Sequence, residues 1–213
     1  MKIKILVRLY LTTCIYLSMV NVYQAQNTEL SMGFYSPDFF NTDKLYFYDI
    51  PNRQKIPGEE IPLDSLVFGK DPNNNYVITS APFWLIPIHN KLDYGIFYLR
   101  LKRLGKEYFE VIVNETTGKT AYVLRESGKA ILWPEFLLNI HSVEFISENQ
   151  KVYDNPKIKS AGRIYDRPFF RPRYIEGDWM EVEILDEDFK IIGKGWICWK
   201  EDDKLLISYN LLS

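Results

Sequence analysis

The sequence predicts an all-β protein built from two related halves, and three observations lead to this prediction. Apolar and polar residues alternate in short stretches such as 109–113 and 180–184, which is the period of a half-buried strand. Turn-forming residues follow these stretches, at 114–118 and 186–188. No segment of ten or more residues sustains an apolar period of 3.6, so any helix is expected to last one or two turns. The third observation is an internal repeat.

Three blocks of the first half recur in the same order in the second half. The matching pairs are 47–51 (FYDIP) with 152–156 (VYDNP), 108–111 (YFEV) with 179–182 (WMEV), and, without a gap, 119–132 (KTAYVLRESGKAIL) with 194–207 (KGWICWKEDDKLLI). Blocks of matching character in one order indicate a tandem repeat. The first copy carries an additional stretch, predicted at about 52–94, between its first and second blocks.

The second copy resembles the bacterial branch of the SH3-like domains. It opens with Tyr153-Asp154, and a long loop leads to Gly177-Asp178-Trp179, an acidic turn and Gly195-Trp196-Ile197. The resemblance implies two tandem SH3-like small barrels of five strands, the first with a long insertion, and a binding or scaffolding role. Signalling-type SH3 domains continue with Pro-Ser-Asn-Tyr where this chain has CWKE at 198–201. Binding of proline-rich peptides is therefore not carried over.

The N-terminus predicts export. Lys2, Lys4 and Arg8 precede a largely apolar stretch at 9–22, and Ala25 offers a small residue before a cleavage point, which is the order of a secretory signal peptide. The stretch is shorter than the ~20 residues that span a bilayer, so no transmembrane segment is expected after cleavage. Lipidation of Cys14 is the alternative, and it is disfavoured because Thr13 precedes Cys14 and the apolar run continues past it.

The predicted organisation follows from these boundaries. It comprises a signal peptide at 1–25, a linker at 26–42, a first SH3-like repeat at 43–148 and a second at 149–213. The whole chain has a formal charge of −2, and loss of the signal peptide makes it more acidic. Such a chain gains no electrostatic help toward nucleic acid, so none is expected as a partner.

Catalytic and metal-binding patterns are weak. Cys198 with His89 or His141 is the one candidate Cys-His pair, but Cys198 lies in the middle of a predicted strand, where a thiol usually behaves as a small buried apolar group. The acidic turns at 186–188 and 202–203 lack the pattern of a calcium loop and are expected to be solvated. We therefore expect no enzyme activity, no metal and no cofactor.

Aromatic residues are the candidate binding site. Alternation over 179–184 places Met180, Val182 and Ile184 on one face and Trp179 on the other, and the same rule places Tyr108 beside Glu110. By the SH3-like resemblance, the first-strand Tyr and the third-strand Trp line a groove. The candidate ligand-binding residues are Tyr153, Asp154, Trp179, Tyr48 and Tyr108.

Two alternatives stay open for the aromatic residues. Trp179 is either a ligand platform or is covered by the segment 165–174, which holds Phe169 and Phe170. The apolar run 83–88 in the insertion is either a second binding surface or packs on its own domain.

These features predict an exported, non-catalytic binding or scaffolding protein of the cell envelope, periplasmic or secreted, whose ligand is a cell-wall peptide or an envelope protein. This step rests on analogy at the level of the fold. The alternative is a periplasmic inhibitor or immunity-type protein that blocks an enzyme through the insertion at 52–94. A hydrolase that uses two paired carboxylates is a third hypothesis, and it requires a cleft with two close carboxylates.

Overall fold

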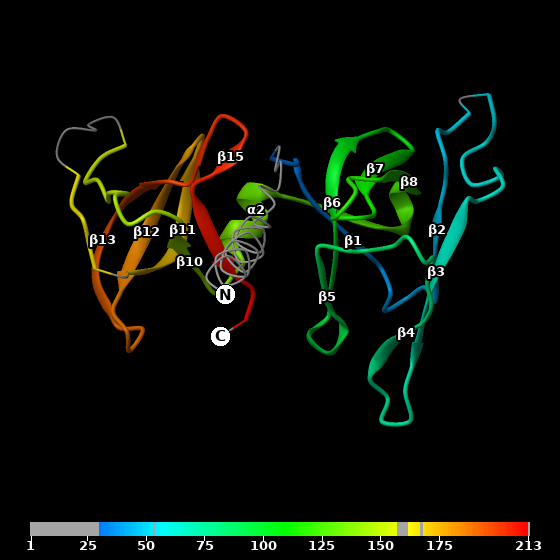
Figure 1. Ribbon diagram of the computed structural model, residues 1–213, viewed down its shortest axis with the longest axis horizontal. Helices are drawn as coiled ribbons and strands as arrows, with labels where there is room; N and C mark the ends of the chain where they lie inside the picture. The colour runs from blue at the N-terminus through cyan, green and yellow to red at the C-terminus, as the bar shows by residue number, and fades with distance from the viewer. Residues whose placement is uncertain (1–29, 53, 157–161, 167, 213) are drawn as a thin grey trace, which may run out of the picture.

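A computed structural model describes residues 30–52, 54–156, 162–166 and 168–212. The described part is all-β, as predicted, and contains one short α-helix, α2 (Trp133–Leu138), and two 3-10 turns. Figure 1 shows two β-lobes side by side along the longest axis, with α2 between them. The predicted signal peptide at 1–25, including Cys14, lies outside the described residues. Within the described part, no helix is long and apolar enough to cross a membrane.

The N-terminal sheet has the strand order β8-β7-β6-β1-β9, and β5 pairs with the free part of β6. All neighbouring strands on this path are antiparallel. The strands are β1 (Gly33–Pro37), β5 (His89–Lys91), β6 (Ile96–Leu104), β7 (Tyr108–Ile112), β8 (Thr120–Leu124) and β9 (Gly128–Leu132). The 3-10 turn η2 (Arg125–Ser127) joins β8 to β9.

The C-terminal sheet repeats this order as β13-β12-β11-β10-β16. Its strands are β10 (Ser142–Phe145), β11 (Phe169–Glu176), β12 (Trp179–Leu185), β13 (Ile191–Cys198) and β16 (Ile207–Asn210). A small hairpin of β14 (Lys200–Glu201) and β15 (Lys204–Leu205) lies where η2 lies in the first copy. In the described residues, neither strand order returns to its first strand, so no sheet closes into a barrel.

The two sheets match in register as well as in order. The β6–β7 pairing shifts between Leu101 and Arg103, and the β11–β12 pairing shifts between Pro172 and Tyr174. Each shift leaves one additional residue, Lys102 on β6 and Arg173 on β11, which is the geometry of a β-bulge. The bulge therefore recurs at the same place in both copies.

Strands β8 and β13 correspond to each other with an offset of one residue from the gapless sequence alignment. Tyr108 pairs with Leu124, whereas its counterpart Trp179 pairs with Cys198. Tyr122 therefore corresponds to Trp196, not to Ile197. The sequence alignment missed this gap because a one-residue slip still superposes apolar residues on apolar residues.

The segment 52–94 contributes most of a third sheet, β2-β3-β4, and a short turn. Its strands are β2 (Lys44–Phe47), β3 (Asp64–Lys70) and β4 (Tyr76–Ser80), followed by β5 and the 3-10 turn η1 (Leu92–Tyr94). The N–H and C=O groups of Tyr48 bond those of Tyr122, so this sheet continues from the edge of β8. In the second copy, Val152 pairs with Arg163 in the corresponding position, and Tyr153 pairs with Trp196.

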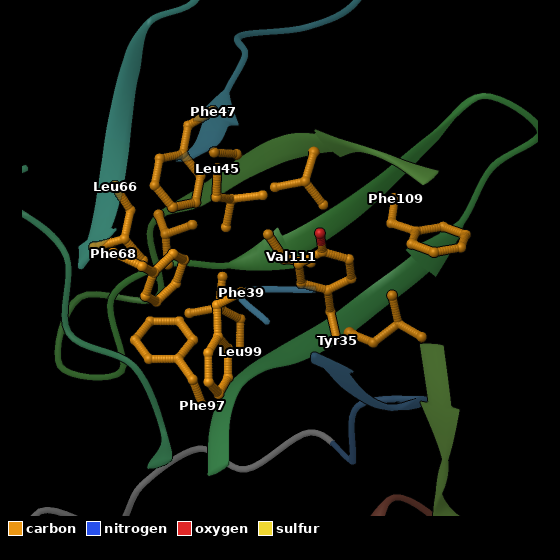
Figure 2. Close-up of a cluster of buried hydrophobic side chains, with 14 of the residues drawn as sticks. Tyr35, Phe39, Leu45, Phe47, Leu66, Phe68, Phe97, Leu99, Phe109 and Val111 are labelled. Carbon is orange, nitrogen blue, oxygen red and sulfur yellow. The ribbon is translucent and has the colours of Figure 1, made fainter. Parts of the chain in front are cut away.

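The described residues form two hydrophobic cores. Figure 2 shows side chains of β1, β2, β3, β6 and β7 meeting in the first core, with the rings of Phe39, Phe68 and Phe97 close together. The edge-on contact of Phe68 with Phe97 places their ring centres 5.7 Å apart. The second core is built from Met180, Val182 and Ile184 of β12 with residues of β10, β11, β13 and α2. The alternation over 179–184 predicts this inward face.

Strand β1 serves both cores. Tyr35 lies in the first core and Phe34 in the second, because successive side chains of a strand point to opposite faces. Phe34 contacts Phe136 of α2 at 4.4 Å between ring centres. The stretch 33–37 is thus a strand paired on both sides and not part of a linker. A boundary at 148/149 also leaves β10 on the N-terminal side, although β10 pairs with β11 and β16.

Candidate functional site

Each copy brings two of the predicted site residues into contact. Tyr153 and Trp179 meet edge to face, with ring centres 5.3 Å apart and an interplanar angle of 85°. Tyr48 and Tyr108 do the same at 5.4 Å and 72°. Because Tyr48 corresponds to Tyr153 and Tyr108 to Trp179, the structure contains the same aromatic pair twice. We call them the first pair (Tyr48, Tyr108) and the second pair (Tyr153, Trp179).

Main-chain pairing with β8 positions Tyr48, and main-chain pairing with β13 positions Tyr153. Tyr153 and Trp196 exchange hydrogen bonds of 2.8 and 2.7 Å, and Tyr48 and Tyr122 exchange bonds of 2.8 and 2.9 Å. The second member stands at the start of the third strand, β7 or β12, after the turn that follows the bulged strand. The backbone therefore sets the contact in both copies.

The turn before Trp179 is held by a residue that the sequence analysis did not single out. The Trp199 main-chain N–H bonds the Asp178 carbonyl, and its indole N–H bonds the Gly177 carbonyl, both at 3.0 Å. Lys200 adds an ion pair with Asp178 at 2.5 Å. The Trp199 ring is buried in the second core, so the position of the turn is tied to that core.

The second pair lies on the outer face of β12. Met180 beside Trp179 is fully buried, whereas Trp179 and Tyr153 are both half-buried and belong to neither core. Trp196 is half-buried on the same face and contacts Tyr174 edge to face at 6.1 Å. The outward position of Trp196 follows from alternation over 195–199, where Gly195, Ile197 and Trp199 are the buried residues.

A small cavity adjoins Tyr153. Its volume is about 240 Å³, and its lining combines apolar side chains with the amide side chains of Asn149 and Gln150. The lining residues are Phe145, Asn149, Gln150, Lys151, Tyr153, Cys198 and Leu206. Gly162 packs so tightly beside this site that a Cβ there would lie 2.7 Å from Tyr153 Cε1 and 2.8 Å from Lys151 Cβ. Gly162 therefore lies close against one side of the Tyr153 ring.

The predicted site residue Asp154 is paired within its own chain. It forms an ion pair and hydrogen bond with Arg163, and both side chains are largely exposed. Exposed pairs of this kind contribute little stability. Asp154 thus links the two sides of the loop that begins at Tyr153.

A buried carboxylate lies on the same face of β12. Glu183 bonds Arg173 at 2.5 Å and approaches Arg171 and Lys194 at 3.7 and 3.9 Å. The hydrogen bond from Arg173 and the surrounding positive charges lower the pKa of Glu183. Arg173 is the bulge residue of β11, and the first copy has Lys102 in this place, bonded to the buried Glu110 at 2.9 Å. Both copies thus use a cation at the bulge to neutralise a carboxylate on the third strand.

Phe169 and Phe170, the two aromatic residues of segment 165–174 considered as a cover for Trp179, lie elsewhere. Phe170 is buried in the second core, and Phe169 pairs with Leu185 at the far end of β12, where it stacks on Phe189 at 5.0 Å. The residue of β11 that pairs with Trp179 is Glu176.

The first pair, in contrast, holds a segment of its own chain. The Tyr108 hydroxyl donates to Glu60 Oε2 at 2.6 Å and accepts the Gly58 N–H at 2.8 Å. Glu60 Oε1 also accepts the Asn52 N–H at 2.7 Å. Burial and the hydrogen bond to Glu60 raise the pKa of Tyr108 to about 12. Tyr48 is almost fully buried.

The candidate Cys-His residues are each engaged elsewhere. The Cys198 thiol donates to the Lys200 carbonyl at 3.0 Å. His89 Nε2 shares a 2.9 Å hydrogen bond with the Tyr209 hydroxyl between the two sheets, and His141 contacts the Phe189 ring. Burial, and secondarily Lys91, lower the pKa of His89 to about 4.

The acidic turn at 186–188 is organised by its own chain. Asp186 accepts the main-chain N–H groups of Asp188 and Lys190 at 3.0 and 2.9 Å, and Lys190 pairs with Asp188 at 3.1 Å. Among the described residues, no group of three or more His, Cys, Asp or Glu side chains is placed to hold a metal ion.

The run 83–88 divides between packing and exposure. Trp84 and Leu85 pack against the first core and Ile88 against the second. Phe83 is 98% exposed. The main chain at Ile86 is fixed by bonds to Val113 and Glu115. The run is therefore anchored to the sheet and presents one aromatic side chain to solvent.

Comparison with known proteins gives no relative from which a role can be transferred: no family model matches, and neither the curated proteins nor the solved structures show a significant match.

Proposed function

We propose that this chain is an exported, non-catalytic binding or scaffolding protein of the cell envelope, made of two SH3-like repeats, that holds its ligand on the second aromatic pair. The observation that carries the proposal is the recurrence of one aromatic pair in both copies, off the cores and at matched strand positions. Neither hydrophobic cluster contains either pair, although Tyr48 itself is buried.

The site has the composition of a binding surface. Aromatic rings give large, rigid contact area, and Tyr and Trp are the residues that most often dominate binding energy at interfaces. Trp179, Tyr153, Trp196 and Tyr174 share one face, and a cavity of about 240 Å³ adjoins it. The ligand class proposed is a cell-wall peptide or another envelope protein.

The repeated five-strand order supports the SH3-like part of the proposal. Tyr153, which lies between β10 and β11 in the chain and bridges to Trp196, and Trp179, at the start of β12, are the two residues that the sequence resemblance assigns to a groove, and they are in contact. A closed barrel of the SH3-like kind is a finer part of this proposal and goes beyond the open strand orders described above.

The test uses the full chain and two variants in parallel. Wild type, Trp179→Ala and Phe83→Ala are immobilised and tested for capture from envelope extract and for binding to purified wall material. We expect Phe83→Ala to bind as wild type does, and Trp179→Ala to bind at least ~10-fold more weakly, as for a hot-spot residue. Equal binding by Trp179→Ala and wild type contradicts the proposal.

A periplasmic inhibitor or immunity-type protein is the second candidate, and the exposure of Phe83 favours it. A single fully exposed Phe on an anchored segment of the insertion is the kind of group that enters a pocket of a partner enzyme. In that case Phe83→Ala loses inhibition of the enzyme and Trp179→Ala retains it. The two variants therefore separate the two functions by opposite outcomes.

A further inference from the structure

The N-terminal lobe contains a cavity of its own, between the turn that follows β1 and the hairpin of β3 and β4. Its volume is about 320 Å³, near the lower end of the ~300–1,000 Å³ that is typical of small-ligand pockets. The lining residues are Phe39, Phe40, Asn41, Thr42, Asp43, Phe68, Gly69, Lys70 and Tyr76. We call this cavity the Phe40 pocket. Its size suits a ligand as small as one amino acid.

Three aromatic rings of the Phe40 pocket hold one another in place. Phe40 is 57% exposed, and it meets Tyr76 edge to face with ring centres 5.1 Å apart and an interplanar angle of 85°. Phe39 contacts Phe40 at 4.5 Å and is itself buried in the first core. Phe40 also lies against Gly95, where a Cβ would stand 3.2 Å from Phe40 Cζ. The pocket therefore offers an anchored aromatic surface to the ring of a ligand.

Two opposite charges line the same pocket and do not pair. The Lys70 ammonium group lies 4.9 Å from the centre of the Tyr76 ring and has no carboxylate partner in the described part of the chain. The Asp43 carboxylate forms no hydrogen bond or ion pair with a described residue, although the Asp43 carbonyl accepts the Phe68 N–H at 2.8 Å. Lys70 follows Phe68 by two residues on β3, so the backbone separates the two charged residues by about 7 Å along the strand direction. A small ligand that carries both charges can reach both groups at once.

We propose that the Phe40 pocket binds a free α-amino acid with an aromatic side chain. The ring of the ligand lies on Phe40 and Tyr76, its ammonium group pairs with Asp43, and its carboxylate pairs with Lys70. Aromatic surface with a few polar groups that fix orientation is the usual composition of a small-molecule site. This inference goes beyond the proposed function, because it concerns a different ligand and the other copy of the repeat.

Four probes test the three contacts one at a time on the full chain. They are L-phenylalanine, N-acetyl-L-phenylalanine, which lacks the ammonium group, L-phenylalanine amide, which lacks the carboxylate, and L-alanine, which lacks the ring. Binding is followed by calorimetry and by the amide NMR signals of Gly69, which lines the pocket, and of Gly95, which lies against Phe40.

Matched protein variants accompany the probes. Two control variants remove an exposed lysine and an exposed phenylalanine that do not line the pocket. The variants are Asp43→Asn, Lys70→Gln and Phe40→Ala, and the controls are Lys129→Gln and Phe83→Ala.

L-Phenylalanine should bind saturably and shift the signals of Gly69 and Gly95. L-Alanine should bind at least ~10-fold more weakly. Loss of either charge of the ligand should weaken binding about 2–5-fold, as for an exposed ion pair. Asp43→Asn should abolish the difference between L-phenylalanine and its acetyl derivative, and Lys70→Gln the difference between L-phenylalanine and its amide.

The remaining variants give the outcomes that decide the inference. Phe40→Ala should weaken binding of L-phenylalanine at least ~10-fold, and both control variants should bind it as wild type does. Absence of saturable binding, or equal binding of L-alanine, overturns the inference. Equal affinity for L-phenylalanine and its amide also contradicts it, because the pocket would then recognise the amino-terminal residue of a peptide. Trp179→Ala should leave this binding unchanged, so failure of the inference and failure of the proposed function are distinguishable.

Discussion

Replacement of two adjacent residues, Trp179 and Met180, tests whether the second aromatic pair is a binding face or a structural one. Met180 is fully buried in the second core, where truncation to Ala removes buried methylenes and leaves a cavity. Such changes cost about 2–5 kcal/mol. Trp179 is half-buried, lies outside the core and contacts Tyr153 edge to face. An aromatic pair of this kind contributes about 0.5–1.5 kcal/mol, so we expect Trp179→Ala to cost about 1 kcal/mol.

The assay is urea unfolding of the full chain, followed by far-UV circular dichroism so that loss of an indole does not bias the signal. Both variants are compared with wild type at equal m-value, because a changed m-value signals a different unfolding transition. Met180→Ala should be the less stable variant by at least ~1 kcal/mol. If Trp179→Ala is the more damaging change, the ring is a packing element and the binding proposal loses its central residue.

Four further results are expected. The fragment 149–213 should be unfolded by amide-resolved NMR, because it lacks β10 and α2 and with them much of the second core. Stability should fall by about 2 kcal/mol as the pH drops from 6.5 toward 4, since the folded state holds His89 neutral and the unfolded state takes up the proton. His89→Gln should abolish this loss. Tyr108→Phe removes the bonds to 58–60, costs about 1–2 kcal/mol and speeds amide exchange at Gly58. Intact-mass analysis of the native protein should give an N-terminus at Gln26, and a retained signal peptide or a lipid mass would contradict the export prediction.

The parts of the fold that were predicted from sequence depend on local periodicity. Alternation over 179–184 gives the inward face of β12, because Met180, Val182 and Ile184 pack on a core and the other side carries Trp179 and two glutamates. The match of Tyr153 with Tyr48 identified one member of each aromatic pair. Both signals are carried by residues whose type is dictated by the face on which they lie.

The parts that were missed depend on contacts between residues far apart in sequence. Phe34 and Tyr35 are both apolar and both buried, each in a different core, so β1 lacks the alternation that marks a half-buried strand. Occupation of the first pair by Gly58 and Glu60 joins residues some fifty positions apart. The only local signal for this contact was the Pro-Gly turn before two glutamates, and that turn does not predict which residue the segment contacts.

The shared strand β1 bears on how the two sites operate. Its opposite faces enter the two cores, and the aromatic contacts of Phe34 with Trp133 and Phe136 tie α2 to the same strand. His89 and Tyr209 add a hydrogen bond between the sheets. Relative movement of the two sheets would expose this apolar interface to water, at about 25 cal/mol for each Å² uncovered. The aromatic pairs are therefore carried on one rigid frame, and a ligand bound at the second pair meets the insertion of the first copy at a fixed distance and angle. A partner that engages both surfaces would gain affinity from that preorganisation. Because Trp179 and Phe83 lie in different lobes, the losses of binding free energy from the two single changes should then add in the combined variant.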